Sequence, residues 1–235
     1  PSMLDTLARN YNNRNPEAWL YEISSEYLPR EGEDLPEEKA VLMVGCYGGE
    51  ADFFTLKGTV ESLLSRLNLP RADYTAVSTH PSYHPGRFAV LTVGDVEIGS
   101  VGEIHPTVLE NFGIGCRAWV ARLDIARLFA VRLPEATYHA LPRFPASTRD
   151  LAVICDDSLP VAVIEKTIAG AVGNILEQIK LFDVYRGAPV PAGKKSVAYS
   201  LVLRAADRTL TVEECDKAIE KALKALSQYG ITLRA

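Results

Sequence analysis

The sequence predicts an α+β protein with two domains, each built on an antiparallel sheet. Short apolar or alternating runs typical of strands recur along both halves of the chain, and helical spacings of apolar residues interrupt them. A proline-rich stretch before residue 146 separates the two groups. With 235 residues, 47% of them hydrophobic and 23% charged, the chain has the composition of ordinary globular domains.

The first domain opens with a helical pattern and then changes to strands. Apolar residues recur at helical spacing from Met3 to Tyr11, and this predicts a helix over 3–14. Because no capping segment precedes it, we expect the chain to be a piece of a longer protein. Two strands are predicted at 18–23 and 39–46, on either side of a loop rich in Pro, Gly and Glu.

The rest of the first domain alternates helices with short strands. A helix is predicted over 52–67, because its leucines and Val60 share one side. The later elements are strands at 75–78, 88–93, 96–104 and 119–125, a hairpin turn at Gly94-Asp95, and a short helix from His105-Pro106 to Phe112. Together they indicate an antiparallel sheet with a few helices.

The connection between the domains is predicted to be extended. Residues 133–145 contain Pro134, Pro142 and Pro145, which exclude a continuous helix. We therefore expect a first domain at 1–132, a linker at 133–145 and a second domain at 146–235.

The second domain has the element order βαββαβ. A strand at 149–155 leads into a helix that Ser158 can cap and Gly173 ends. Strands at 175–186 and 195–205 follow. A capping box at 211–214 starts a helix that ends at Gly230, and a final strand covers 231–233. This is the order of the split βαβ, or ferredoxin-like, unit, in which both helices cover one sheet face and the other is free.

The free face carries the candidate binding residues. Alternation places Asp183 and Tyr185 on one side of their strand, and it gives the next strand an apolar row opposite a small, polar and open row that includes Ser196. The Tyr185 ring could stack a nucleobase while Asp183 and Ser196 bond its edge, and the small Ala152 would let the base approach the backbone. The alternative is a half-exposed tyrosine on a solvated sheet.

Basic residues lie near the ends of these strands and could meet phosphates. For any one of them, ordinary solubilising charge is the simpler interpretation. They are Arg149, Arg186, Lys194, Lys195 and Arg204. The whole chain has a net charge of −5, which argues against a nonspecific nucleic-acid coat but leaves room for a local basic rim.

Catalytic and metal sites are not predicted. His80 and His84 are separated by proline-broken backbone, and with His105-Pro106 they indicate turns rather than metal ligands. The segment 45–49 lacks the lysine and spacing of a phosphate loop and is interpreted as a tight turn.

The remaining features predict a cytoplasmic protein without membrane contact. No apolar run has the length of a membrane helix, and the first residues lack the pattern of a signal peptide. The four cysteines are far apart and lie in apolar stretches, so we expect them to be buried, reduced thiols. They are Cys46, Cys116, Cys155 and Cys215.

Seven short motifs carry a family resemblance. In the second domain they are FPASTRDLA at 144–152, LFDVYRG at 181–187, GKKS at 193–196 and RTLTVEE at 208–214; in the first they are DFFTLKG at 52–58, HPGR at 84–87 and VGEIHP at 101–106. The chain resembles, over nearly its whole length, the carboxy-terminal part of bacterial phenylalanyl-tRNA synthetase beta subunits. In that subunit a non-catalytic class II synthetase-like core domain precedes a ferredoxin-fold anticodon-binding domain.

The resemblance implies an enzyme of two alpha and two beta subunits that charges tRNA-Phe with phenylalanine, using ATP and Mg²⁺. Its active site is on alpha, so we expect no catalytic residue and no cofactor in this chain, with tRNA-Phe and the alpha subunit as partners. In agreement, no arginine that could hold an ATP phosphate occurs between Arg14 and Arg30. One departure is ISSEY at 23–27, where family members more often have IGRVF.

The resemblance also assigns the anticodon contacts. The first anticodon base stacks on the tyrosine of the family's Phe-Asp-x-Tyr motif, which is Tyr185 here. The matching base-edge contacts are Asp183, Ala152 and Ser196, the residues that strand alternation places on the free face.

Two other functions remain open. A free-standing regulatory protein could bind a small amino acid with a ferredoxin-like domain, but it would need a glycine-rich turn after the first strand, where Cys155-Asp-Asp-Ser158 is acidic. A purely structural oligomerisation role predicts that Tyr185 and Ser196 can be replaced without effect.

Overall fold

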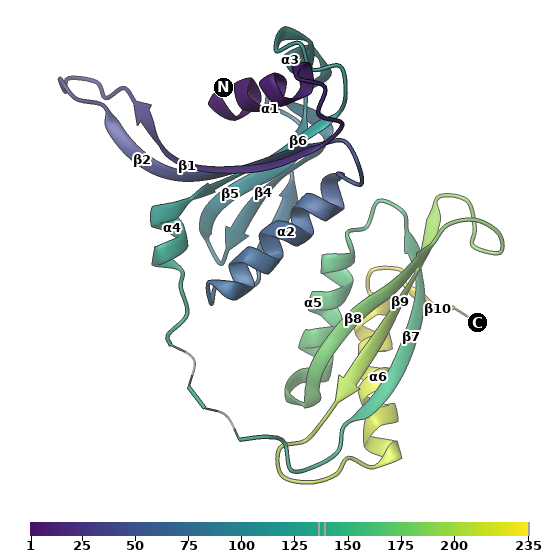
Figure 1. Ribbon diagram of the computed structural model, residues 1–235. Helices are drawn as coiled ribbons and strands as arrows, with labels where there is room; N and C mark the ends of the chain where they lie inside the picture. The colour runs from purple at the N-terminus through teal and green to yellow at the C-terminus, as the bar shows by residue number, and fades with distance from the viewer. Residues whose placement is uncertain (136, 139, 235) are drawn as a thin grey trace. The chain divides into compact units, whose positions relative to one another are not determined.

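The computed structural model describes residues 1–135, 137–138 and 140–234. It forms two compact units, residues 1–138 and 139–235 (Figure 1). The division falls within the segment predicted as a linker, 133–145, two residues of which (136 and 139) lie outside the described residues. The exact bounds of that linker stay a prediction.

Unit 1 is a six-stranded antiparallel sheet with helices on both faces. Its elements are α1 (Ser2–Asn12), β1 (Ala18–Leu28), β2 (Glu37–Tyr47), α2 (Phe53–Arg66), β3 (Asp73–Ala76), β4 (Tyr83–Val93), β5 (Val96–Ile104), α3 (Pro106–Asn111), β6 (Ala118–Asp124) and α4 (Ile125–Ala130). The strand order is β1-β2-β6-β5-β4-β3, which makes β1 and β3 the edge strands.

Two apolar clusters hold unit 1 together. One includes Leu56 of α2 and Leu128 of α4, and the other includes Leu7 of α1 and Leu109 of α3. Helix α1 approaches the sheet closely, because a Cβ added to Gly45 would lie 2.8 Å from the sulfur of Met3. Glycine at this position therefore lets the helix pack directly on β2.

The predicted elements of unit 1 are present, with two differences. Strand β1 extends to Leu28, five residues beyond the predicted end at residue 23. Helix α4 is not predicted, because its apolar residues continue the strand-like run of β6. It begins there because the Asp124 carboxylate accepts a hydrogen bond from the Arg127 backbone N–H at 3.0 Å, an N-terminal cap.

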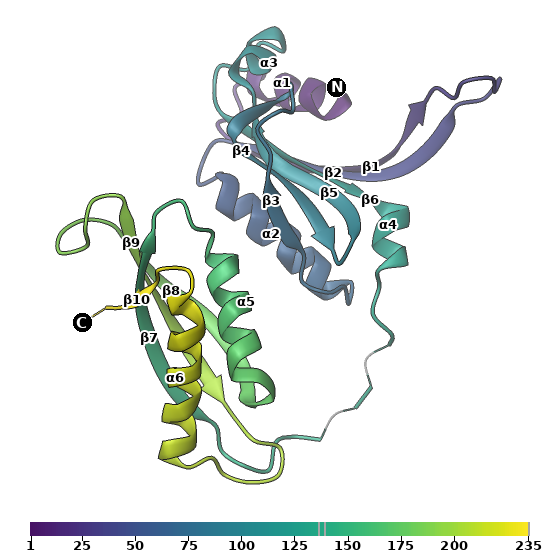
Figure 2. The same ribbon diagram turned by 180° about the vertical axis from the view of Figure 1, so that it is seen from behind.

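Unit 2 confirms the predicted order βαββαβ. Its elements are β7 (Ser147–Asp156), α5 (Val161–Val172), a 3₁₀ turn η1 (Gly173–Ile175), β8 (Leu176–Tyr185), β9 (Lys194–Leu203), α6 (Val212–Ser227) and β10 (Thr232–Leu233). The sheet order is β10-β7-β9-β8, so β9 is flanked by β7 and β8. Figures 1 and 2 show both helices on the same side of this sheet.

The helix ends of unit 2 follow the sequence in part. The capping box of α6 is confirmed, since the Thr211 backbone N–H donates to Glu214 at 2.9 Å and the Glu214 N–H donates to Thr211 at 3.3 Å. The cap predicted from Ser158 is wrong: Pro160 occupies the N-cap of α5, so the Ser158 hydroxyl lies too far before the first turn. Gly173, at φ +70°, ends α5 as predicted, whereas α6 ends at Ser227, before Gly230.

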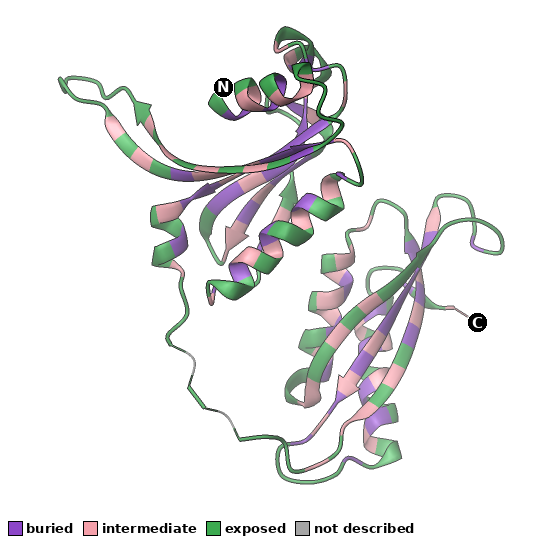
Figure 3. Cartoon of the chain, in the orientation of Figure 1, coloured by how far each residue is buried: buried purple, intermediate pink, exposed green. Residues whose placement is uncertain are grey.

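The core of unit 2 lies between the helices and one sheet face. The apolar row of β9 is fully buried there, as its alternation predicts, and Figure 3 colours most of this strand as buried. The row consists of Val197, Tyr199, Leu201 and Leu203, each with 0% exposure. The other face, which α5 and α6 do not cover, is the one available to a partner.

Candidate nucleic-acid interface

The four predicted base contacts lie together on the face of the unit 2 sheet opposite the helices. Ser196 of β9 pairs with Tyr185 of β8. Ala198 pairs with Asp183 on one side and with Ala152 of β7 on the other. The residues therefore occupy two adjacent rows across three strands. Because they alternate with the buried row of β9, they face away from the core.

A β-bulge sets the faces of β8. The pairing shifts between Leu181, opposite Tyr199, and Asp183, opposite Ala198, so that Phe182 is an extra residue. Without this insertion, Asp183 would share the core side with Leu181. Sequence alternation within 182–185 predicts the correct faces locally, but it does not predict the bulge.

The Tyr185 ring is held at the end of its strand. Its hydroxyl donates a hydrogen bond to the Ala188 carbonyl at 2.8 Å, and 39% of the residue is exposed. Gly187 lies beside the ring, since an added Cβ would be 3.3 Å from the phenolic oxygen, and its φ of +124° disfavours other residues. The turn after β8 thus fixes the ring while part of its surface stays open for stacking.

Arg234 belongs to the same face, and the sequence analysis does not include it. Its backbone N–H donates to the Ala152 carbonyl at 2.9 Å, and its side chain donates to the Ser196 hydroxyl at 3.3 Å. The guanidinium carbon lies 5.7 Å from the centroid of the Tyr185 ring, within cation–π range. Alternation from Thr232 in the final strand was the signal that could have placed Arg234 on this face.

The face is less open along β9 than alternation predicts. Ser196 is 2% exposed and Ala198 is 7% exposed. The reason is that β9 is a central strand with small side chains, and longer neighbours such as Arg234 and Tyr185 stand around them. A ligand therefore reaches the Ser196 hydroxyl only after Arg234 shifts.

The five basic residues predicted near phosphates are not brought together, and each has an internal partner. Arg186 pairs with Asp157 at 2.7 Å and Lys194 with Asp156 at 2.9 Å, at the end of the sheet where Tyr185 lies. These two remain candidates for phosphate contact, because their pairs are exposed and cost little to exchange.

The other three basic residues lie elsewhere. Arg149 faces the helices, 3.4 Å from Asp216 of α6, and the amine of Lys195, a 6% exposed residue, donates to the Asp157 carbonyl at 2.7 Å. Arg204 pairs with Glu177 at 2.6 Å and also donates to the Phe144 carbonyl. It is eight residues along from Ser196, roughly 26 Å in an extended strand.

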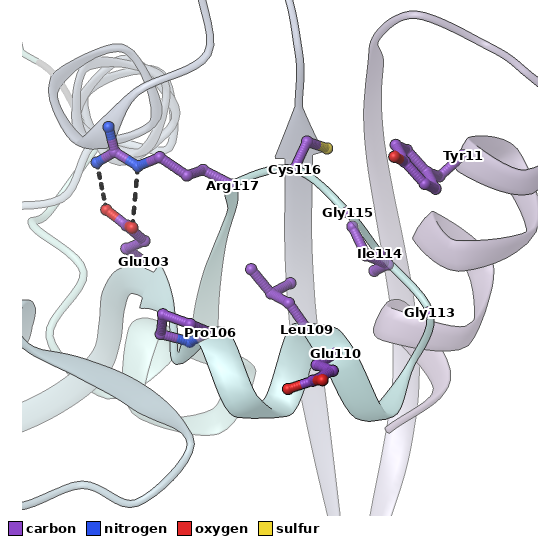
Figure 4. Close-up of a pocket in the computed structure, with 10 residues that line it drawn as sticks. All are labelled: Tyr11, Glu103, Pro106, Leu109, Glu110, Gly113, Ile114, Gly115, Cys116 and Arg117. Atoms are coloured by element: carbon purple, nitrogen blue, oxygen red, sulfur yellow. Dashed lines mark hydrogen bonds and ion pairs between the residues drawn. The ribbon is translucent and has the colours of Figure 1, made fainter.

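Unit 1 contains a pocket of about 630 Å³ between α1, α3 and the segment 113–117 (Figure 4). Its buried carboxylate, Glu103, is bonded to Arg87 at 3.1 Å and to Arg117 at 2.9 Å. Burial alone would raise the pKa of Glu103, but the two arginines outweigh it and hold that pKa below its ordinary value. Since the carboxylate is already paired, the pocket presents no free catalytic acid or base.

The histidines of unit 1 act in turns, as the sequence predicts. Their Nδ1 atoms accept hydrogen bonds from the backbone N–H two residues on: His80 from Ser82 at 3.2 Å, His84 from Gly86 at 3.1 Å and His105 from Thr107 at 3.2 Å. In the described ranges no three His, Cys, Asp or Glu side chains cluster as a metal site would require. Nor does any helix of those ranges have the length and apolarity to cross a membrane.

The cysteines are free thiols, and three of the four are buried as predicted. Burial raises the pKa of the Cys46 thiol to about 12, with a further contribution from Asp52, so this thiol is not a nucleophile at neutral pH. Cys116 differs from the prediction: it is half-buried, because it lies in the segment that lines the pocket of Figure 4.

Family models match both units. Residues 1–125 match the model described as the phenylalanyl tRNA synthetase beta chain CLM domain. Residues 142–234 match the ferredoxin-fold anticodon binding domain.

Curated relatives match the full length of the chain. The phenylalanine–tRNA ligase beta subunit of Clostridium tetani is 45% identical over 235 residues, which are 99% of this chain and 30% of that protein. The beta subunit of Symbiobacterium thermophilum is 43% identical over 246 residues, covering 100% of this chain and 28% of that protein. The chain thus spans about 30% of the length of these relatives. The solved pyrrolysyl-tRNA synthetase of Desulfitobacterium hafniense is a more distant match, with TM-score 0.44 and 20% identity over 55% of this chain and 47% of its own.

Proposed function

The chain belongs to the phenylalanyl-tRNA synthetase beta-chain family, and from that membership we propose that its unit 2 binds tRNA-Phe and reads the anticodon. The open sheet face is the reading surface: Tyr185 stacks the first anticodon base, and Asp183, Ser196 and the backbone beside Ala152 meet its edge. The observation that carries this proposal is the placement of these four residues in adjacent rows of the free face. Stacking on a strand-borne aromatic ring with polar groups beside it is how sheets recognise single-stranded RNA.

The intact enzyme supplies the catalysis in this proposal. It is an ATP-dependent aminoacyl-tRNA ligase that requires Mg²⁺, and unit 1 supports its assembly with the alpha subunit. Unit 1 itself does not fit an ATP site: β1 carries no arginine, and the guanidinium of Arg122, on β6, is held by Glu26 at 2.7 Å. The relatives do not favour the alternative of a free-standing regulator that binds a small ligand.

Base preference of the unchanged chain tests the proposal. We expect the chain to bind an anticodon stem-loop of tRNA-Phe more tightly than a stem-loop that differs only in the first anticodon base, by about 5-fold or more, because each contact to a base edge discriminates by roughly 1 kcal/mol or more. Fluorescence anisotropy at low salt is the measurement, because few phosphate contacts are available. Equal affinity for both stem-loops would contradict anticodon reading by this face.

Arg234 is expected to tune this binding. Arg234→Met keeps an apolar stem over the Tyr185 ring but removes the charge and the bond to Ser196. If the guanidinium moves to the RNA on binding, the variant loses affinity for both stem-loops and its binding depends less on salt concentration. A steeper salt dependence in the variant would contradict a role of this cation at the RNA.

A further inference from the structure

The outer edge of unit 1 is an unusually long and unguarded strand. Strand β1 has eleven residues and pairs with β2 at every position without a bulge. Among the described residues, no strand pairs with its other edge. Edge strands are normally protected by shortness, bulges, lysine or proline, and β1, with the sequence AWLYEISSEYL, has none of these.

One face of β1 presents large apolar side chains to solvent. Trp19, Tyr21, Ile23 and Tyr27 alternate along the strand and are 44%, 77%, 65% and 62% exposed. A row of this size beside free backbone N–H and C=O groups is typical of a surface that receives another strand.

The charges of β1 identify a second copy of the same strand as a fitting occupant. Two β1 strands that pair in antiparallel orientation about a two-fold axis must share a face, so the axis passes through a residue near the middle. An axis at Glu22 opposes two Glu22 carboxylates, and an axis at Ser24 opposes Glu22 with Glu26. An axis at Ile23 opposes no two like charges, because Glu22 then meets Ser24 and Glu26 meets Leu20 of the second copy.

We propose that two copies of this chain associate through their β1 strands, antiparallel and centred on Ile23, to form one continuous sheet. In this register the two Ile23 side chains meet at the axis and Trp19 packs opposite Tyr27 of the second copy. Glu26 adds no unpaired charge, because Arg122 already holds its carboxylate at 2.7 Å. The interface is isologous, so it closes at a dimer rather than growing into a filament.

Cysteine crosslinking tests the register. In the proposed dimer the two residues at 23 face each other with Cα atoms about 4.5–5.5 Å apart, which is within disulfide range. The two residues at 25 are about 13 Å apart, since each lies opposite residue 21. We expect Ile23→Cys to form a disulfide-linked dimer under mild oxidation and Ser25→Cys to form little above the background of the unchanged chain. Equally fast crosslinking of the two variants would overturn the proposal.

A charge exchange tests the association without covalent chemistry. Ile23→Asp and Ile23→Lys each place like charges at the axis, and we expect each to weaken the dimer about tenfold or more in analytical ultracentrifugation. Mixed together, the two variants should restore a dimer that contains one of each. Phe54→Asp, at a 73% exposed residue of α2, is the matched control and should dimerise like the unchanged chain.

Two outcomes of the ultracentrifugation would sink the idea. One is an unchanged chain that stays monomeric up to high micromolar concentration. The other is a dimer that forms equally well with aspartate at position 23. Far-UV circular dichroism of each variant establishes that the exposed substitutions leave the fold intact.

Discussion

Replacing Tyr185 by alanine is expected to weaken binding of the tRNA-Phe anticodon stem-loop by roughly 1–3 kcal/mol, or about 5- to 150-fold. The ring is the one large aromatic surface in the two rows that hold Asp183, Ala152 and Ser196, so no neighbour can replace its stacking. The affinity is measured at low salt by fluorescence anisotropy. The loss should also erase most of the preference for the cognate first anticodon base, because the edge contacts depend on a base held by the ring.

Two control variants separate stacking from other effects of that change. Tyr185→Phe keeps the ring but removes the hydrogen bond to the Ala188 carbonyl, which costs about 0.5–1.5 kcal/mol, so its loss of affinity should stay below that of the alanine variant. Tyr229→Ala removes an equally exposed tyrosine, 52% accessible, that follows α6, and should leave binding unchanged. If Tyr185→Ala binds like the unchanged chain, the sheet does not read the anticodon.

The layout of unit 2 was predictable because its signals are local. The capping box at Thr211, the glycine at 173 and the alternation of β9 each depend on a few neighbouring residues and are all present in the structure. The same local alternation placed Asp183 and Tyr185 beside Ser196. The bulge at Phe182 was not predictable, because one inserted residue leaves no trace in composition and is visible only against the partner strand.

The parts of the site that failed prediction depend on tertiary contacts. Asp156 and Asp157 come from the turn after β7, yet they hold Lys194, Arg186 and the amine of Lys195. Arg234 follows a strand of two residues, too short to show alternation by itself, and only its pairing beside β7 places it over Tyr185. In both cases the side chains meet through register between distant strands.

Replacing Leu201 by alanine is expected to lower the free energy of unfolding of unit 2 by about 2–5 kcal/mol. Leu201 is 0% exposed and lies in the apolar cluster between β9 and the helices, where its loss leaves a cavity that neighbours cannot fill completely. The clusters of unit 1 contain none of the same residues, so unit 1 should keep its stability. Leu233→Ala, at a 55% exposed position of β10, is the control and should change stability by no more than about 0.5 kcal/mol.

The positions of the tryptophans allow the two units to be followed separately. Both tryptophans of the chain, Trp19 and Trp119, belong to unit 1, so their fluorescence reports on that unit during urea unfolding, whereas far-UV circular dichroism reports on both. Leu201→Ala should move a circular-dichroism transition to lower urea and leave the fluorescence transition in place. An equal shift of both transitions would mean that the two units unfold together, and the loss of RNA binding in a site variant such as Tyr185→Ala would then have to be corrected for unfolding of the whole chain.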